Sequence, residues 1–474
     1  MYRQETAWRV LNQAVFRFYL FFISLSLFSR KGVESLKAIQ DYFRFSERKT
    51  TYRTEFIAGL TTFLSMAYIL FVNPMVLGET GMDKSSVFVA TAVASAIGTL
   101  IMGLYANYPI AQAPGMGLNA FFAYTVVLGM GIPWQTALAG VFTSGIVFFL
   151  LTLFKIRETI INSIPFSLKM ATGAGIGLFI AFIGLKNAGI VIIDPQSALP
   201  KLGNIHTGNT LLTVFGLLVT AIFLVRKIRG GVFYGMLLTA IVGMFFGLVP
   251  VPQGIQDIVG SVPSIAPTFA QLEWEKLLRP TGDLLIVIFT FLFVDFFDTA
   301  GTVMAVAAQA GLLKDNKLER GGRALTSDAI ATMVGAWLGT STVTSYIESS
   351  SGVAAGGRTG FSSVVVAALF LLSLVFAPLL GIVTPQVTAP ALIIVGVLMA
   401  ANLLKIKWDE IDEAFPAFLT VLLMPLTYSI ATGIALGFVT YPIVKIAKGK
   451  AREIHPIMYG LFLVFIAYFI WLAR

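Results

Sequence analysis

Residues 109–120 read "PIAQAPGMGLNA", and this stretch decides the fold because Pro109, Pro114, Gly115 and Gly117 interrupt an otherwise apolar segment. Residues 345–356, "SYIESSSGVAAG", resemble it about half a chain later and carry their own break of serines and glycines. If both segments cross a membrane, the irregular backbone must be buried in protein or line a cavity. Matching breaks in two halves of a chain therefore predict a binding site near the bilayer midplane.

The composition places both breaks in a membrane protein. Hydrophobic residues make up 57% of the 474 residues and charged residues only 12%, against about 45–50% and about 25% in soluble domains. The chain has no cysteine and two histidines, His206 and His455, which excludes disulfides and thiolate catalysis and leaves little for a metal site. We expect one polytopic domain with no metal and no cofactor, and no redox chemistry.

Hydropathy, turn residues and loop charges predict about fourteen membrane-spanning segments. They lie near 54–77, 86–107, 112–130, 133–155, 164–187, 209–226, 230–249, 282–310, 324–340, 342–357, 360–383, 387–404, 415–430 and 431–447. With a cytoplasmic N-terminus, the outer loops hold only Lys84, Lys201, Lys276 and Arg279. This bias follows the positive-inside rule, so the net charge of +9 is explained by topology and by contact with anionic membrane lipid, and no nucleic acid is expected.

The chain divides into two repeats with extensions at both ends. The segment at 164–187 echoes 384–405, so residues 54–250 and 282–447 form two units of seven spans, which are inverted because seven is odd. Residues 1–53 form a cytoplasmic or interfacial segment, in which 14–28 resemble an interfacial helix more than a signal peptide. A further apolar segment at 455–472 either crosses the membrane or lies against the bundle.

Acidic residues inside the predicted spans are the candidate site residues. Asp295 and Asp298 lie in "FVDFFDTAGT" (293–302) and share a helical face, and Glu348 lies in the interrupted tenth span with Gln112 and Asn119 in the matching third span. Intramembrane acids are expensive to bury and often relay protons. Without nearby lysine or arginine, this set suits a neutral ligand with N–H donors or a cation. The alternative is a structural role without a ligand. Asp298 would then hydrogen-bond threonine or backbone groups at a broken helix, and Asn119 would join two helices.

The same residues carry a resemblance to a known family. "GLTTFLSMAYILFVNP" (59–74), "AQAPGMGLNAFF" (111–122), "FVDFFDTAGT" (293–302), "TSYIESSSGVAAGGRTG" (344–360) and "TAPALIIVGVLMA" (388–400) resemble the AzgA-like purine permeases of the nucleobase:cation symporter-2 family. The resemblance covers roughly residues 36–472. It implies an all-α fold of seven plus seven inverted spans, with a core domain of spans 1–4 and 8–11, a gate domain of spans 5–7 and 12–14, and short extended segments in spans 3 and 10.

The resemblance also implies roles for individual residues. Glu348 would hold the edge of the nucleobase ring, Asp295 would face it, and Asn119 would be a polar residue needed for transport. Asp298 would support the site or take part in proton coupling, a role that Asp295 and Glu348 share as candidates. In the uracil and xanthine branches a histidine usually stands about where Thr299 stands here. Phe121 and Phe296 are candidates for stacking on the purine ring.

The function that follows is proton-coupled uptake of purine nucleobases across a bacterial-type cell membrane. Hypoxanthine and guanine are favoured, and adenine is the alternative. Three other classes compete: an anion transporter of the same fold, which the acids disfavour; an intramembrane aspartyl protease, which needs its aspartates on different helices; and a passive channel. Protons and purines are the expected partners, and the sequence leaves open whether the protein forms a homodimer.

Overall fold

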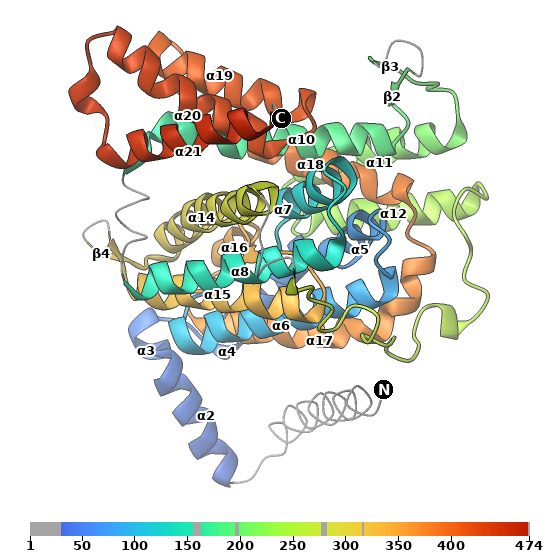
Figure 1. The fold of residues 1–474 in the computed structure, drawn as a ribbon. Coiled ribbons are helices and arrows are strands. Elements are labelled where there is room, and N and C mark those ends of the chain that lie inside the picture. Colours follow the sequence, from blue (N-terminus) through green and yellow to red (C-terminus); the bar gives the residue numbers. More distant parts are fainter. Residues whose placement is uncertain (1–29, 155–162, 195–198, 276–281, 315–316, 473–474) are drawn as a thin grey trace.

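The computed structural model describes residues 30–154, 163–194, 199–275, 282–314 and 317–472 (Figure 1). The described residues are mostly helical, which confirms the predicted all-α architecture. Nine of the helices that they form are long and apolar enough to cross a membrane. The count of fourteen crossings stays a prediction, and the expected interfacial helix at 14–28 lies outside the described residues.

The first part of the chain runs through sixteen elements before a long connection. In order they are α2 (Arg30–Phe43), α3 (Phe45–Arg48), α4 (Tyr52–Met66), α5 (Ile69–Gly78), α6 (Lys84–Ile101), the π-helix η1 (Met102–Ala106), β1 (Gln112–Pro114), α7 (Met116–Ala120), the π-helix η2 (Phe121–Gly129), α8 (Trp134–Leu153), α10 (Phe166–Asn187), β2 (Val191–Ile193), β3 (Pro200–Leu202), α11 (Gly208–Val225), α12 (Gly231–Phe245) and the 3-10 helix η3 (Ile255–Asp257).

The second part begins with the long helix α14 and ends with α21. Its elements are α14 (Gly282–Ala310), β4 (Leu313–Lys314), β5 (Lys317–Leu318), α15 (Gly321–Leu338), β6 (Val343–Ser345), α16 (Ser349–Ala354), α17 (Gly360–Leu372), the 3-10 helix η4 (Ser373–Gly381), α18 (Pro385–Ala400), the 3-10 helix η5 (Ala401–Lys405), α19 (Ile411–Leu426), α20 (Ile430–Ala447), the 3-10 helix η6 (Ala451–Glu453) and α21 (Pro456–Leu472).

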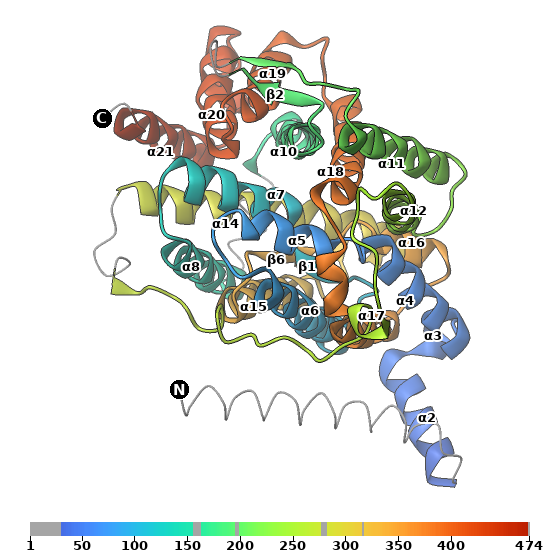
Figure 2. The ribbon, with the colours of Figure 1, turned by 90° about the vertical axis from the view of Figure 1, so that its right-hand side faces the viewer.

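The helices pack as two groups that face each other. One group contains α4, α6, α8, α14, α15 and α17, and the other contains α10, α11, α12, α18, α19 and α20 (Figures 1 and 2). The short elements α5 and α7 contact both groups. The C-terminal segment, whose placement the sequence left open, forms α21 and packs against α20. The strands of the interrupted segments pack on α6, α14 and α15 of the first group, and α7, which follows β1, contacts α10 of the second group.

Capping residues fix where several helices begin. The side chains of Thr51, Asp83 and Thr207 accept hydrogen bonds from backbone N–H groups in the first turns of α4, α6 and α11. Such caps satisfy donors that have no partner within the helix. Large side chains on the outside of the bundle are apolar, among them Phe245, which is 84% exposed, and Leu404, as expected for a lipid-facing surface.

Candidate functional site

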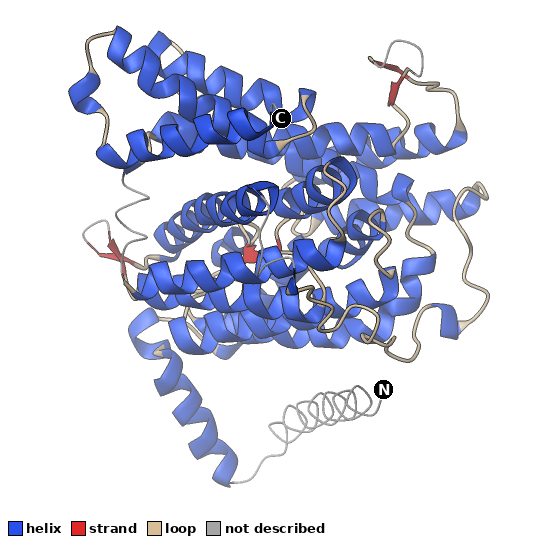
Figure 3. Ribbon diagram, in the orientation of Figure 1, coloured by secondary structure: helices blue, strands red, loops and turns tan. Residues whose placement is uncertain are grey.

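The two interrupted segments meet as a pair of short strands in the middle of the molecule. β1 and β6 are antiparallel, with Gln112 opposite Ser345 and Pro114 opposite Val343, and Figure 3 shows these strands enclosed by helices. The ladder continues beyond them, because the Gly115 N–H donates to the Thr342 carbonyl at 2.9 Å. The sequence therefore predicted correctly that spans 3 and 10 contain extended backbone.

The structure changes how the two breaks correspond. The repeat seen in the sequence aligns Gln112 with Glu348, but Gly115 caps α7 as Glu348 caps α16. The structural counterpart of Gln112 is its ladder partner Ser345. The two stretches were aligned by matching their small and polar residue types. The strand register, in contrast, is set by which backbone groups pair. The half of the site that contains β1 thus has a glycine where the other half has a carboxylate.

Glu348 lies at the start of α16 and is only partly buried. Its Oε1 accepts a hydrogen bond of 2.8 Å from the hydroxyl of Tyr68, which lies between α4 and α5. The sequence gave no signal for Tyr68, because its partner is 280 residues away. Within the described part of the chain Glu348 forms no ion pair, so the carboxylate keeps acceptor capacity for a ligand.

Helix α16 is held in place along α4. The hydroxyls of Ser65 and Ser351 lie 2.8 Å apart, and the Arg358 N–H donates to Glu55 Oε1 at 2.9 Å. Close contact requires Gly352, because a Cβ there would lie 2.1 Å from Thr62 Oγ1 and 2.5 Å from the Ala58 carbonyl oxygen. The position of Glu348 is therefore set by span 1, on which the whole half-helix rests.

Asp295 and Asp298 lie on α14 in different surroundings. Asp295 is 2% exposed, and the hydroxyls of Thr299 and Thr332 lie 3.5 and 3.4 Å from its two oxygens, although each hydroxyl has a shorter hydrogen bond to another acceptor. Asp298 is partly exposed, and its side chain makes no hydrogen bond within the described residues. A Cβ on Gly115 would lie 3.7 Å from Asp298 Oδ2, so the carboxylate lies beside the N-terminus of α7.

The structure places the two aspartates in different surroundings, and their roles stay predictions. The resemblance makes Asp295 the acid that faces Glu348, with Asp298 in support. In the structure Asp298 lies beside the N-terminus of α7, while Asp295 is turned toward α15. Three residues along a helix correspond to a rotation of about 60° between side chains, which is enough to place one acid in the site and the other behind it.

A fourth acid, Asp328 of α15, was not singled out from the sequence. It is fully buried, and its Oδ1 accepts from the Ser345 N–H at 3.1 Å and from Gln112 Nε2 at 3.2 Å. Its Oδ2 lies 2.7 Å from the hydroxyl of Thr299. Asp328 therefore joins both strands to α14. The available signal was a lone acid in the ninth span, "ALTSDAIATM" (324–333).

The two predicted amides are engaged in internal hydrogen bonds. Besides Asp328, Gln112 contacts Ser327, whose hydroxyl donates to Gln112 Oε1 at 3.3 Å. Asn119 donates to the Pro114 carbonyl at 3.4 Å and accepts from the Ser341 hydroxyl. Both amides are fully buried. They tie β1 and α7 to the second half of the molecule, and the sequence gave no sign of these partners.

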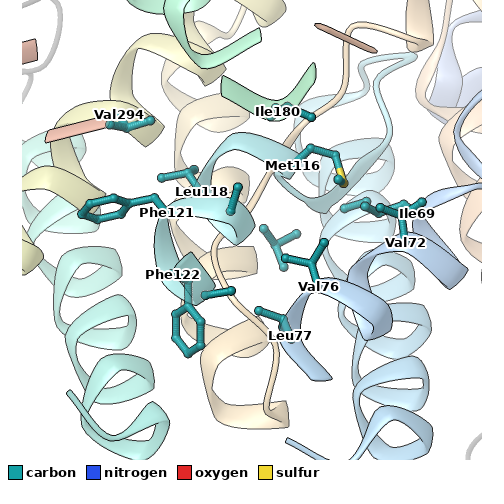
Figure 4. Close-up of a cluster of buried hydrophobic side chains, with 14 of the residues drawn as sticks. Ile69, Val72, Val76, Leu77, Met116, Leu118, Phe121, Phe122, Ile180 and Val294 are labelled. Atoms are coloured by element: carbon teal, nitrogen blue, oxygen red, sulfur yellow. The ribbon is translucent and has the colours of Figure 1, made fainter. Parts of the chain in front are cut away.

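Phe121 and Phe296 both lie in apolar clusters. Phe121 packs edge-to-face on Phe291 with ring centroids 5.0 Å apart, and Figure 4 shows it among buried side chains of α5, α7 and α14. Phe296 packs in the same way on Phe148. Each ring is at most 3% exposed, so neither offers a free face to a ligand in this state.

The carboxylates of Glu348 and Asp298 are partly exposed, whereas Asp328 and Gln112, which bond the strands, are fully buried. We call Glu348 and Asp298 the open side of the site, and neither has an ion pair in the described part of the chain. The described residues contain no group of three or more His, Cys, Asp or Glu side chains that could hold a metal ion. The arrangement can accept N–H hydrogen bonds from a neutral ligand or bind protons.

The comparison with protein families identifies the chain. The model of the Permease family, Xan_ur_permease, matches residues 53–436. The protein belongs to this permease family. It is a transporter and not an enzyme.

Relatives of this permease are similar over nearly the whole chain. The guanine/hypoxanthine permease PbuG of Bacillus subtilis is 61% identical, and the match covers 92% of this chain and all of the relative. The adenine permease AdeP of Escherichia coli is 43% identical, with 90% and 95% covered. Among solved structures, the transmembrane domain of the cyanobacterial bicarbonate transporter BicA superposes with a TM-score of 0.63 at 16% identity, covering 81% of this chain and 96% of that domain. That likeness concerns the fold alone.

Proposed function

We propose that this permease takes up purine nucleobases together with protons, and that hypoxanthine and guanine are its preferred substrates. The observation that carries the substrate class is the 61% identity, over the full length of the relative, to a guanine/hypoxanthine permease. An adenine-selective symporter is the second candidate, because an adenine permease is 43% identical. The substrates of the two candidates, oxopurines and adenine, differ in the hydrogen-bonding groups on the edge of the six-membered ring.

The carboxylate of Glu348 suits the N–H groups of an oxopurine. Guanine and hypoxanthine carry an N1–H donor, and guanine adds an amino group on the same edge. A carboxylate accepts such donors in charge-assisted bonds that are stronger than neutral ones. Tyr68 holds one oxygen of Glu348 at 2.8 Å, which orients the second oxygen for the ring.

Proton coupling is assigned to the acids on the open side. Asp298 interacts electrostatically with Glu348 and with Asp328, and three nearby carboxylates are costly to keep charged together in a low dielectric. Among Asp298, Glu348 and Asp328, only the side chain of Asp298 makes no hydrogen bond in the described chain. We therefore favour Asp298 as the coupling acid over the other two candidates, Asp295 and Glu348. A proton on Asp298 and a purine on Glu348 would stabilise the same conformation, which links the two fluxes.

The rest of the proposal concerns the membrane. The loop charges support a cytoplasmic N-terminus in a bacterial-type cell membrane, and the exposed apolar side chains support contact with lipid. The first seven and last seven spans form inverted repeats, and the two helix groups act as core and gate domains. A homodimer stays a prediction that cross-linking in the membrane would test.

An anion substrate is the rival that the fold likeness suggests. Helix N-termini can bind anions, but the carboxylates of Glu348 and Asp298 lie at the N-termini of α16 and α7 and would repel one. Uptake into proteoliposomes separates the candidates. We expect labelled hypoxanthine to accumulate only with an inward proton gradient, with competition by guanine stronger than by adenine and no competition by uracil or sulfate. Stronger competition by adenine than by guanine would favour the adenine-selective symporter. Uptake that is undiminished by a protonophore would show that transport is not coupled to protons.

A further inference from the structure

A cavity lies between α5, α10 and α18, away from the carboxylates of the central site. Its volume is about 210 Å³. We name it the outer vestibule, because the loop charges predict that this end of the bundle faces outward. Its lining residues are Val72, Met75, Val76, Glu79, Asn187, Pro385, Gln386, Thr388 and Leu392.

The outer vestibule is lined by the same face of the α5 segment that holds Glu348 through Tyr68. Tyr68, Val72, Val76 and Glu79 are spaced three or four residues apart, so they occupy one face of the helical segment that includes α5. Tyr68 contacts Glu348 at one end of this face, and Glu79 reaches the cavity about 16 Å further along, at 1.5 Å per residue. Figure 4 shows Val72 and Val76 among the apolar side chains of α5 and α7.

The lining combines apolar walls with a few polar groups. Val72, Val76 and Leu392 provide flat apolar surface, and Gln386 and Asn187 place side-chain amides at the cavity while being only partly buried. The side-chain amide of Gln386 makes no hydrogen bond within the described part of the chain. Apolar walls with a small number of unsatisfied polar groups are typical of a site for a small planar ligand.

We propose that the outer vestibule is a first binding site for the nucleobase, which the purine occupies before it reaches Glu348. This inference rests on the proposed function, because it takes the purine as the substrate. The carboxamide of Gln386 has one donor side and one acceptor side, which match the N1–H and the C6 carbonyl of an oxopurine. The exposed carboxylate of Glu79 and the absence of lysine and arginine from the described lining disfavour anions.

A binding site on the route has a kinetic signature. Weakening it slows arrival at the central site and departure from it to the same extent, so the equilibrium affinity of the central site does not change. A mutation that merely disturbed packing between α5 and α18 would lower stability or change the equilibrium affinity. A change in the association and dissociation rates at an unchanged dissociation constant therefore indicates a binding site, and a changed dissociation constant or stability indicates a packing role.

The first experiment uses the natural absence of cysteine. Met75→Cys introduces a single thiol into the lining of the vestibule while Gln386 stays intact, and a membrane-impermeant maleimide can label it from outside. Gln253→Cys on the exposed loop after α12 is the matched control. We expect hypoxanthine to slow labelling at 75 at least threefold and to leave 253 unaffected. Protection should persist when Glu348→Gln is added, because the vestibule binds by itself. Labelling at 75 that is insensitive to hypoxanthine, or absent from the outside, overturns the proposal.

The second experiment measures rates. Gln386→Leu should lower the association and dissociation rates of hypoxanthine three- to tenfold, with the dissociation constant at the central site changed less than twofold, and Gln253→Leu should behave as wild type. Equal rates in Gln386→Leu and wild type overturn the proposal. Uptake of purine by the wild-type protein is measured in parallel. If the wild type takes up purine but Gln386→Leu has unchanged rates, only the vestibule proposal fails; if the wild type takes up no purine, the proposed function fails.

Discussion

Two carboxylates near the β1–β6 pair have contrasting surroundings. Asp328 is fully buried and accepts hydrogen bonds from Ser345, Gln112 and Thr299. Glu348 is partly exposed, and within the described residues Tyr68 is the one side chain that donates to it. A buried carboxylate surrounded by donors stabilises the structure, whereas a carboxylate with acceptor capacity to spare can bind a ligand. Both residues are carboxylates, so the number of hydrogen-bond donors around each one, and not the residue type, distinguishes a structural acid from an acid that can bind a ligand.

The largest effect should come from Asp328→Leu. This substitution keeps the number of side-chain heavy atoms but leaves the buried Ser345 N–H without its acceptor, at about 1–3 kcal/mol, and it removes one of the two acceptors of the Gln112 amide. We expect the thermal unfolding temperature of the purified protein to fall strongly and uptake to be lost. The control is Asp409→Leu on the exposed loop before α19, which should unfold as wild type. Unchanged stability of Asp328→Leu would show that the acid is not part of the framework.

Asp298→Asn should abolish accumulation while leaving binding. The amide keeps the shape of the side chain but cannot take up a proton, so purine should equilibrate without being concentrated. The measurement is uptake into vesicles with and without an imposed proton gradient, beside purine binding between pH 5 and 8. If the variant still concentrates purine under a gradient and loses it on collapse of the gradient, the coupling acid is Asp295 or Glu348.

Glu348→Gln should weaken purine binding without changing stability. The loss of the charge-assisted part of the bond amounts to about 1–2 kcal/mol, or roughly a tenfold higher dissociation constant. Binding of labelled hypoxanthine to purified protein measures it, with Glu275→Gln, an exposed loop residue, as control. Affinity equal to wild type would place the substrate elsewhere, and a lowered unfolding temperature would make Glu348 a framework residue like Asp328.

Tyr68→Phe should have the smallest effect. It removes one hydroxyl that orients Glu348, at about 0.5–1.5 kcal/mol, which raises the dissociation constant roughly two- to tenfold. The ring and its packing remain, so stability should hold. Tyr234→Phe on α12, partly exposed, is the control. An effect larger than that of Glu348→Gln would mean that Tyr68 itself contacts the ligand.

The sequence determined the membrane fold and the neighbourhood of the site. Apolar spans are set by composition, and the breaks at Gly115 and at Ser349–Gly352 are set by local backbone preferences, so both were readable without a structure. Glu348 and Asp298 stood out because a charge in an apolar span is costly unless it has a use. The same argument would have found Asp328, which lies in a span with more serine and threonine.

Only the tertiary structure decided which acid is sealed and which is open. Asp328 draws its donors from β1, β6 and α14, and Tyr68 lies 280 residues from Glu348. The register that makes Gly115 the counterpart of Glu348 and the rotation that turns Asp295 toward α15 are likewise set by packing between the two halves. Hydrogen-bond partners from distant segments leave no local pattern in the chain, because each depends on how the helices come together.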